Sequence, residues 1–194
     1  QAEDGIRDYK VTGVQTCALP IYVTGETLAS FSAREVFEPL GMADTRFVPP
    51  EDWRPRIAPT TQKAGRWLVG EVHDPRAHLL GGVAGHAGLF STAADLAVYA
   101  QMLLRGGRAR ERRILKPETV AQMIQGHAIP TLVGSTNLTL AELTLPPAET
   151  VRALGWDRQS KYSHNRGQGW SESAFGHGGF TGTVLWIEIG RAHV

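Results

Sequence analysis

The sequence has little cysteine, no long apolar run and almost no net charge. Its 194 residues include one cysteine, Cys17, so no internal disulfide can stabilise the chain. No apolar run reaches the roughly 20 residues that a membrane-spanning helix needs. Lys and Arg number 20 against 19 Asp and Glu, for a formal net charge of +1. This net charge gives no electrostatic case for nucleic acid or an anionic membrane as a partner.

What the sequence does contain is enough apolar material for a folded core. Hydrophobic residues make up 42% of the chain, which excludes a disordered protein. No repeat or low-complexity tract is present, and helical segments alternate with short strand-like ones. This pattern predicts an α+β (mixed α/β) fold.

The two ends of the chain do not match what lies between them. A coding sequence for Gln15–Ile21, read on the opposite strand, can encode Glu188–Val194 in another frame. Natural termini have no reason to be antisense copies, and the implied DNA resembles a sequencing-library adapter. We therefore expect residues 1–21 and 188–194 to be adapter-derived, with no fold and no specific packing.

Residues 22–187 are then expected to be one incomplete domain from a longer gene product. Cys17 would belong to the adapter and would carry no information about redox conditions. A missing signal peptide would be equally uninformative, because neither end would be native.

Local signals place the elements of this central region. A helix is expected over 24–42, ended by Pro39 and Gly41. Thr92 and Asp95 have the spacing of a capping box, which predicts a helix that ends at Gly106 and Gly107. The other expectations are a glycine-rich loop at 81–90, a helix from Pro117, a strand at 154–157, and a tight turn leading into a buried strand at 175–187.

The segment Gly176-His-Gly-Gly-Phe-Thr-Gly-Thr183 is the sharpest candidate for chemistry. Glycines beside a strand let a ligand or another backbone approach closely, and a histidine there can donate hydrogen bonds or exchange a proton. On composition alone, a glycine-rich hairpin with a satisfied histidine is the favoured explanation.

Four segments occur in an order that resembles a known family: Phe37–Met42, Gly88–Leu96, Leu154–Trp156 and Gly176–Gly182. They resemble the serine hydrolases of the class C β-lactamase and penicillin-binding-protein-like family. The wording of 82–96 is most similar to the esterase and carboxypeptidase branches. The resemblance implies an antiparallel sheet flanked by helices, here lacking its upstream strands, and a location outside the cytoplasm.

The resemblance also implies roles for individual residues. His177 would orient the acidic group of the substrate or its proton network, and Gly178 and Gly179 would keep a strand edge open for it. The backbone N–H of Phe180 would donate to the oxyanion. His86 would brace the substrate-binding wall. The substrate would be a small molecule or peptidoglycan-like, with no metal, no organic cofactor and no nucleic acid.

The family's nucleophile motif, Ser-x-x-Lys, is missing. Thr60-Thr-Gln-Lys63 has its spacing but lies among prolines, where no helix would present it. Ser163-His-Asn165 imitates a second family motif but falls too late in the chain, so we expect no catalytic role for it. We expect the chain itself to be inactive and its parent to be an acyl-serine hydrolase. The alternative is a non-catalytic module that binds peptidoglycan or a protein partner.

Three further groups of residues are explained without a functional site. His73, Asp74, His78 and His86 lack the spacing of a zinc site. The arginines that follow the 92–107 helix are expected to form a solvated face. Trp67, Trp156 and Trp186 are expected to be core aromatics.

Overall fold

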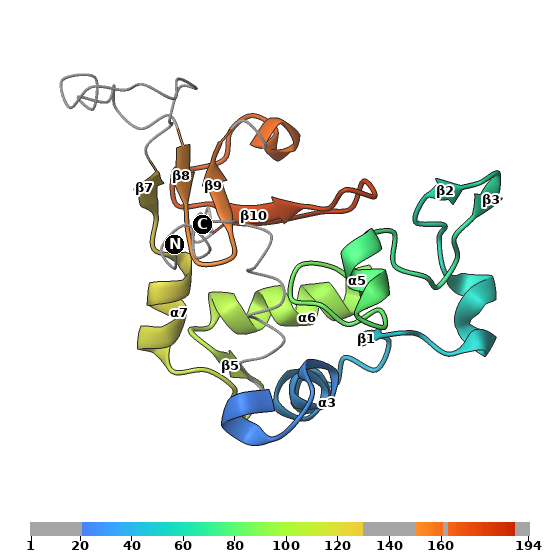
Figure 1. Ribbon diagram of the computed structural model, residues 1–194. Helices are drawn as coiled ribbons and strands as arrows, with labels where there is room; N and C mark the ends of the chain where they lie inside the picture. The colour runs from blue at the N-terminus through green and yellow to red at the C-terminus, as the bar shows by residue number, and fades with distance from the viewer. Residues whose placement is uncertain (1–20, 130–149, 161–162, 189–194) are drawn as a thin grey trace, which may run out of the picture. The chain divides into compact units, whose positions relative to one another are not determined.

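The computed structural model describes residues 21–129, 150–160 and 163–188 (Figure 1). They form two compact units, the first ending at Tyr99 and the second beginning at Ala100. Both units contain helices and antiparallel strands, which confirms the predicted α+β class. None of the helices in the described part of the chain has the length and apolar character of a membrane-crossing segment.

The first unit begins with one helical stretch made of α3 (Leu28–Ser32), the wide π turn η1 (Ala33–Phe37) and α4 (Glu38–Leu40). Thr27 caps its start by accepting a hydrogen bond from the Ser30 N–H. Pro39 has no N–H to continue the α-helical ladder, which accounts for the widened turn before it. Gly41 ends the stretch in the left-handed region, at φ 72°, as predicted.

Beyond this helix, β1 (Arg46–Phe47) pairs antiparallel with β4 (Leu89–Phe90). The residues before β1 are held by Asp95, near the start of α6 (Ala93–Leu104). Asp95 Oδ2 accepts hydrogen bonds from the Asp44 N–H at 2.9 Å and from the Thr45 hydroxyl at 2.7 Å. The Ser91 hydroxyl lies 2.7 Å from Thr45 Oγ1. Asp95 and Thr45 are buried, so this carboxylate ties the start of β1 to the chain that follows β4.

The rest of the first unit consists of short elements. They are the 3₁₀ helix η2 (Glu51–Arg56), the hairpin of β2 (Gln62–Lys63) and β3 (Arg66–Trp67), and helix α5 (Pro75–Leu79). A small core of Val72, Ala77 and Ala84 lies around α5. The glycine-rich loop packs closely, backbone against backbone. A Cβ on Gly88 would stand 2.2 Å from the Gly82 carbonyl oxygen.

In the second unit, α6 ends at two glycines as predicted. The N–H groups of Gly106 and Gly107 donate to the carbonyls of Leu103 and Met102, the pattern of a helix end closed by left-handed glycines. A hairpin of β5 (Arg108–Ala109) and β6 (Arg112–Arg113) leads to α7 (Pro117–Ile124), with Pro117 in its first turn.

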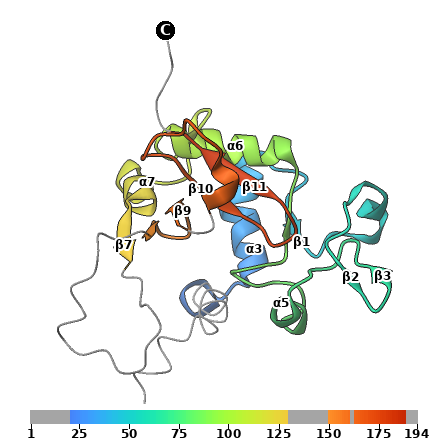
Figure 2. The same ribbon diagram turned by 90° about the horizontal axis from the view of Figure 1, so that it is seen from above.

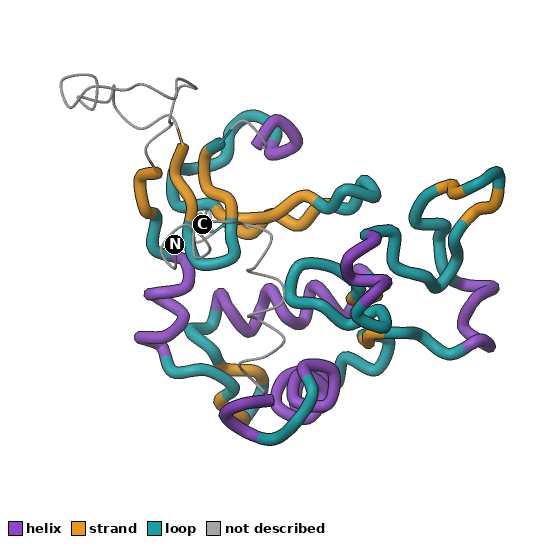
Figure 3. The backbone as a smooth tube through the Cα atoms, viewed as in Figure 1, coloured by secondary structure: helices purple, strands orange, loops and turns teal. Residues whose placement is uncertain are grey.

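A five-stranded antiparallel sheet follows, in the order β11-β10-β9-β8-β7 (Figure 3). Its strands are β7 (His127–Ile129), β8 (Thr150–Arg152), β9 (Asp157–Gln159), β10 (Phe175–Gly178) and β11 (Val184–Ile187). The strand expected at 154–157 is wrong except for Asp157. Leu154 and Gly155 instead form a two-residue turn, because Gly155 takes φ 78° and Ala153 and Trp156 exchange backbone hydrogen bonds.

Two expectations about single residues need correction. Trp67 is 58% exposed, because β3 belongs to a two-stranded hairpin whose four strand residues are all exposed. Glu188 does pack specifically: its carboxylate accepts hydrogen bonds from the backbone N–H and the hydroxyl of Ser171. Ile21 is half exposed, and residues 1–20 and 189–194 lie outside the described residues.

The Asp95 contacts give a stability prediction. Asp95→Ala leaves the Asp44 N–H and the Thr45 hydroxyl without their buried acceptor, which should lower the free energy of unfolding by about 2–4 kcal/mol. Urea denaturation followed by circular dichroism measures the loss. Asp52→Ala removes an exposed carboxylate and serves as the control. Equal effects of the two substitutions would contradict the role given to Asp95.

Candidate active-site hairpin

The predicted motif folds as the β10–β11 hairpin, whose strands lie side by side in both views (Figures 1 and 2). Phe175 pairs with Ile187, Gly176 with Trp186, His177 with Leu185 and Gly178 with Val184. On the other side of β10, β9 pairs with it only at Gly176, opposite Asp157. Within the described residues, no strand pairs with His177 or Gly178 on that side. An extended substrate could therefore add there as a strand.

One face of this hairpin is packed into the sheet. Phe175 is fully buried and Ile187 is 3% exposed. The Phe175 ring meets Trp156 edge to face, with the ring centroids 5.2 Å apart, a favourable aromatic geometry. His177 lies on the same face, two residues along the strand, but its side chain is exposed. The packed residues fix the strand, and the histidine projects from its solvent-facing end.

The hydrogen bond of His177 determines which of its ring nitrogens is available. His177 Nδ1 lies 2.8 Å from the carbonyl oxygen of Gly178. A carbonyl oxygen only accepts, so Nδ1 carries the proton and donates. In the neutral ring, Nε2 then presents its lone pair outward. His177 can therefore accept a proton or a hydrogen bond from a substrate group at Nε2.

The glycines of the motif differ in how strictly they are required. A Cβ on Gly176 would stand 2.3 Å from the Leu185 carbonyl oxygen and 2.5 Å from the Trp186 indole. The contacts under 3 Å of a Cβ on Gly178 or Gly179 would be with side chains, those of Asn165 and Thr183. Gly176 is therefore needed for the fold, whereas Gly178 and Gly179 keep space that is bordered by side chains.

Phe180 occupies the turn that joins the two strands. The Gly179 N–H donates to the Thr183 carbonyl at 2.6 Å, and the Gly182 N–H donates to the Gly179 carbonyl at 3.0 Å. Gly182 takes φ 91°, and the Phe180 side chain is 84% exposed. The residue predicted to supply the oxyanion donor therefore lies in a closed turn, two residues after the end of β10.

A short strap covers the second face of the hairpin, and the sequence did not predict it. This is the 3₁₀ helix η4 (Ser163–Arg166). Asn165 Oδ1 accepts a hydrogen bond from Trp186 Nε1 at 3.1 Å, which holds the Asn165 amide against Gly178. The Arg166 guanidinium lies over the Trp186 ring at 5.6 Å. Asn165, the last residue of the Ser163-His-Asn165 segment for which no catalytic role was expected, thus packs against the candidate site.

The buried Asp157 holds η4 in place. It is 3% exposed, and its Oδ2 accepts hydrogen bonds from the Ser160 and Ser163 hydroxyls at 2.9 and 3.0 Å. Its Oδ1 has no hydrogen-bond partner in the described structure, and Arg152 Nη1 lies 3.9 Å away. Ser163 of the imitation motif is therefore a structural hydroxyl in this contact.

His86 lies in the first unit, on the glycine-rich loop. Its Nε2 is 3.0 Å from Asp74 Oδ1, and Asp74 also accepts hydrogen bonds from the Arg76 and Ala77 N–H groups as the cap of α5. Burial opposes ionisation of Asp74, but the hydrogen bonds from Ala77, His86 and Arg76 outweigh it and lower the pKa of Asp74. The observed contact of His86 is with a helix cap.

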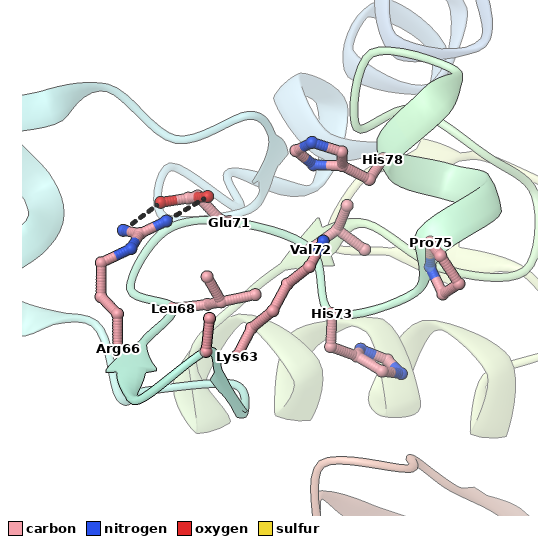
Figure 4. Close-up of a pocket in the computed structure, with 9 residues that line it drawn as sticks. Lys63, Arg66, Leu68, Glu71, Val72, His73, Pro75 and His78 are labelled. Atoms are coloured by element: carbon pink, nitrogen blue, oxygen red, sulfur yellow. Dashed lines mark hydrogen bonds and ion pairs between the residues drawn. The ribbon is translucent and has the colours of Figure 1, made fainter.

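Beside α5, the first unit contains a cavity of about 260 Å³ (Figure 4). Leu68, Val72 and Pro75 give it apolar walls, and Lys63, His73 and His78 line it from other directions. Glu71 and Arg66 form a bidentate ion pair at its border, at 2.9 and 3.2 Å. No group of three His, Cys, Asp or Glu residues in the described ranges could hold a metal ion.

The segment Thr60-Thr-Gln-Lys63, which has the spacing of the nucleophile motif, has a structural role. The Thr60 hydroxyl donates to the carbonyls of Leu68 and Glu71, and Lys63 lies on strand β2. No helix presents this pair, as predicted. The structure thus brings His177, Gly178, Gly179 and Phe180 together on one hairpin and places His86 in the other unit.

Comparison with known proteins identifies the family. A β-lactamase family model matches residues 22–192. An N-acetylmuramyl-L-alanine amidase of Bacillus subtilis is 31% identical over 186 residues, which cover 86% of this chain and 37% of the relative. A protein of Escherichia coli (strain K12) named for D-alanyl-D-alanine carboxypeptidase activity is 29% identical over 184 residues, or 86% of this chain and 38% of the relative.

Solved structures share the fold. A penicillin-binding-protein homologue from Caulobacter crescentus superposes with a TM-score of 0.58 at 18% identity, over 91% of this chain and 47% of that one. A β-lactamase from Mycobacterium bovis gives 0.54 at 22% identity, over 89% and 48%. The chain belongs to the β-lactamase family, as its motifs predicted. It spans less than two fifths of the length of the two sequence relatives described above.

The different steric requirements at Gly176 and Gly178 are testable. Gly176→Ala drives a methyl group into the Leu185 carbonyl and Trp186, so the free energy of unfolding should fall by about 3 kcal/mol. Gly178→Ala displaces only the Asn165 amide and should cost about 1 kcal/mol or less. Chemical denaturation of both variants measures the difference. Equal losses would show that the register between β10 and β11 is not as described.

Asp74 gives a pH prediction. Its folded pKa lies below the unfolded value of about 3.9. The ionised carboxylate therefore stabilises the fold above that pH, and this contribution is lost as the pH falls through the folded pKa. Asp74→Asn should reduce the loss of unfolding free energy that the original chain shows between pH 6 and about 2.5. Asp52→Asn, at an exposed carboxyl, should leave that pH dependence unchanged. An unchanged pH dependence in Asp74→Asn would refute the assignment.

Proposed function

We propose that this chain forms the C-terminal part of an acyl-serine hydrolase, with the β10–β11 hairpin as one wall of its active site. The observation that carries the proposal is the combination of His177 and an unpaired strand edge. His177 is exposed and binds the Gly178 carbonyl through Nδ1, which leaves Nε2 for a substrate, and β9 leaves the edge at His177 and Gly178 free of strand pairing within the described residues.

The β10–β11 hairpin can take part in acyl transfer in the following way. A serine supplied by the rest of the parent would attack a carbonyl carbon, and the carbonyl oxygen would become an oxyanion. The Phe180 N–H would donate to that oxyanion, since Phe180 lies in the turn only two residues beyond the end of β10; one such donor is worth about 3 kcal/mol in other acyl-transfer enzymes. His177 Nε2 would hold an acidic group of the substrate or accept its proton.

We further propose that the substrate is a peptidoglycan-type amide. The support is that the two sequence relatives carry the names of an amidase and of a D-alanyl-D-alanine carboxypeptidase. An extended peptide can also satisfy the free backbone groups of a strand edge. A non-catalytic binding module is not favoured, because these names are those of hydrolytic enzymes.

Catalysis by the chain and by its parent gives the decisive experiment. The 194-residue chain should not hydrolyse nitrocefin or p-nitrophenyl acetate, because it holds no Ser-x-x-Lys. The longer product of the same gene should be labelled covalently by a fluorescent penicillin and should release D-alanine from a D-alanyl-D-alanine peptide.

In that longer protein, His177→Ala should lower kcat/KM by roughly 100-fold. His164→Ala, at an exposed histidine on η4, is the matched control and should have little effect. Serine-dependent hydrolysis by the 194-residue chain alone would overturn the proposal. So would a longer product whose upstream region lacks Ser-x-x-Lys.

A further inference from the structure

The segment from Arg105 to Lys116 carries a dense cluster of positive charge. It holds six basic side chains and one acidic side chain, Glu111. The basic residues are Arg105, Arg108, Arg110, Arg112, Arg113 and Lys116, and all are exposed. No ion pair joins any of them to a carboxylate in the described part of the chain. We call this segment the basic hairpin, since β5 and β6 form its centre (Figure 1).

Two of these arginines have structural explanations. The Arg113 guanidinium donates to the carbonyls of Gly106 and Leu115, at 3.1 and 3.2 Å. Arg105 directly follows α6, where a cation offsets the negative end of the helix dipole. Arg108, Arg110 and Arg112 make no comparable contact among the described residues.

The fold places two of the remaining arginines unfavourably. Arg108 pairs directly with Arg113 across the hairpin, and like charges at opposed positions repel. Arg110 lies in the two-residue turn at φ 49°, a conformation that glycine or asparagine adopts at lower cost. Residues that break local rules without a compensating contact in the chain are candidates for function.

We propose that the basic hairpin is a docking surface for the anionic headgroups of a lipid membrane. Arginine suits this partner, because its planar guanidinium pairs with phosphate oxygens in a bidentate way. An exposed apolar side chain lies at the base of the hairpin: Leu104, the last residue of α6, is 46% exposed. Apolar and cationic side chains together are typical of interfacial binding.

The arrangement of the arginines favours a planar partner over a grooved one. Arg108 and Arg113 share one face of the hairpin, Arg112 belongs to the other cross-strand pair, and Arg110 lies in the turn. Arginines that surround the tip of a hairpin can all contact the planar layer of lipid headgroups. A β-ribbon that reads a nucleic-acid groove needs its contacts on the face that enters the groove. The proposal is independent of the catalytic function proposed above.

Vesicle binding of the whole chain tests the proposal. The probes are vesicles of phosphatidylcholine alone and of phosphatidylcholine with about one third phosphatidylglycerol, in co-sedimentation at low salt. The chain should bind the anionic vesicles and not the neutral ones. Binding should disappear near 0.5 M salt, as screening shortens the reach of surface charges to a few ångströms.

Paired variants locate the effect on the hairpin. Arg108→Gln with Arg112→Gln should weaken binding to anionic vesicles about 25-fold, since each cation near the surface contributes about fivefold. Lys63→Gln with Arg76→Gln removes two exposed charges from the first unit and should change binding far less. Circular dichroism of each variant verifies that it is folded.

Arg110→Gly provides a second test that separates binding from folding. Glycine relieves the left-handed strain, so this variant should be at least as stable as the original chain while it binds about fivefold more weakly. A structural role for Arg110 would move stability and binding together.

Several outcomes would overturn the proposal. They include equal binding to neutral vesicles, unchanged binding in the Arg108 and Arg112 double variant, equal losses in the two double variants, and tighter binding to a short DNA duplex or to heparin than to anionic vesicles. Inorganic phosphate at millimolar concentration should not compete with the vesicles; effective competition would indicate a site for free phosphate and would also overturn it.

Discussion

The carboxylate of Asp95 is the contact on which the first unit depends. It lies at the start of α6, yet both of its accepted hydrogen bonds come from residues about fifty positions earlier, Asp44 and Thr45. The Asp95 backbone N–H is satisfied separately by the Thr92 hydroxyl, at 3.2 Å. Helix α6 therefore keeps its cap at Thr92, while the buried Asp95 carboxylate points away from the helix and binds the residues before β1. One ionised side chain joins the end of the first helical stretch to the beginning of the next long helix.

The second unit uses the same principle at the candidate site. Asp157 is buried beneath η4 and binds two serine hydroxyls of that region. Through η4 it positions Asn165 against Gly178 and Trp186. The strand that carries His177 is thus supported on one face by aromatic packing and on the other by a polar network. Both supports come from residues outside the His-Gly-Gly motif.

Sequence reasoning succeeded where a single residue determines the local backbone. Gly41, Gly106 and Gly107 end helices because left-handed conformations suit glycine, and Pro117 begins one because its missing N–H costs nothing there. It failed where the outcome depends on residues far apart in the chain. Nothing near Trp67 shows that its strand lacks a core, and nothing near Asn165 shows that Trp186, 21 residues later, will bind it. Glu188 shows the same limit, because its partner Ser171 lies 17 residues away.

The wide turn at Ala33–Phe37 has a consequence for comparing members of this family. A π turn holds one residue more than an α-helical turn, so the chain can gain or lose a residue there while both helix ends stay in place. Relatives that differ by a one-residue insertion before the Glu-Pro-Leu-Gly segment can therefore keep the same cap at Thr27 and the same stop at Gly41. Alignments should place such a gap inside this turn, where the backbone can accommodate it.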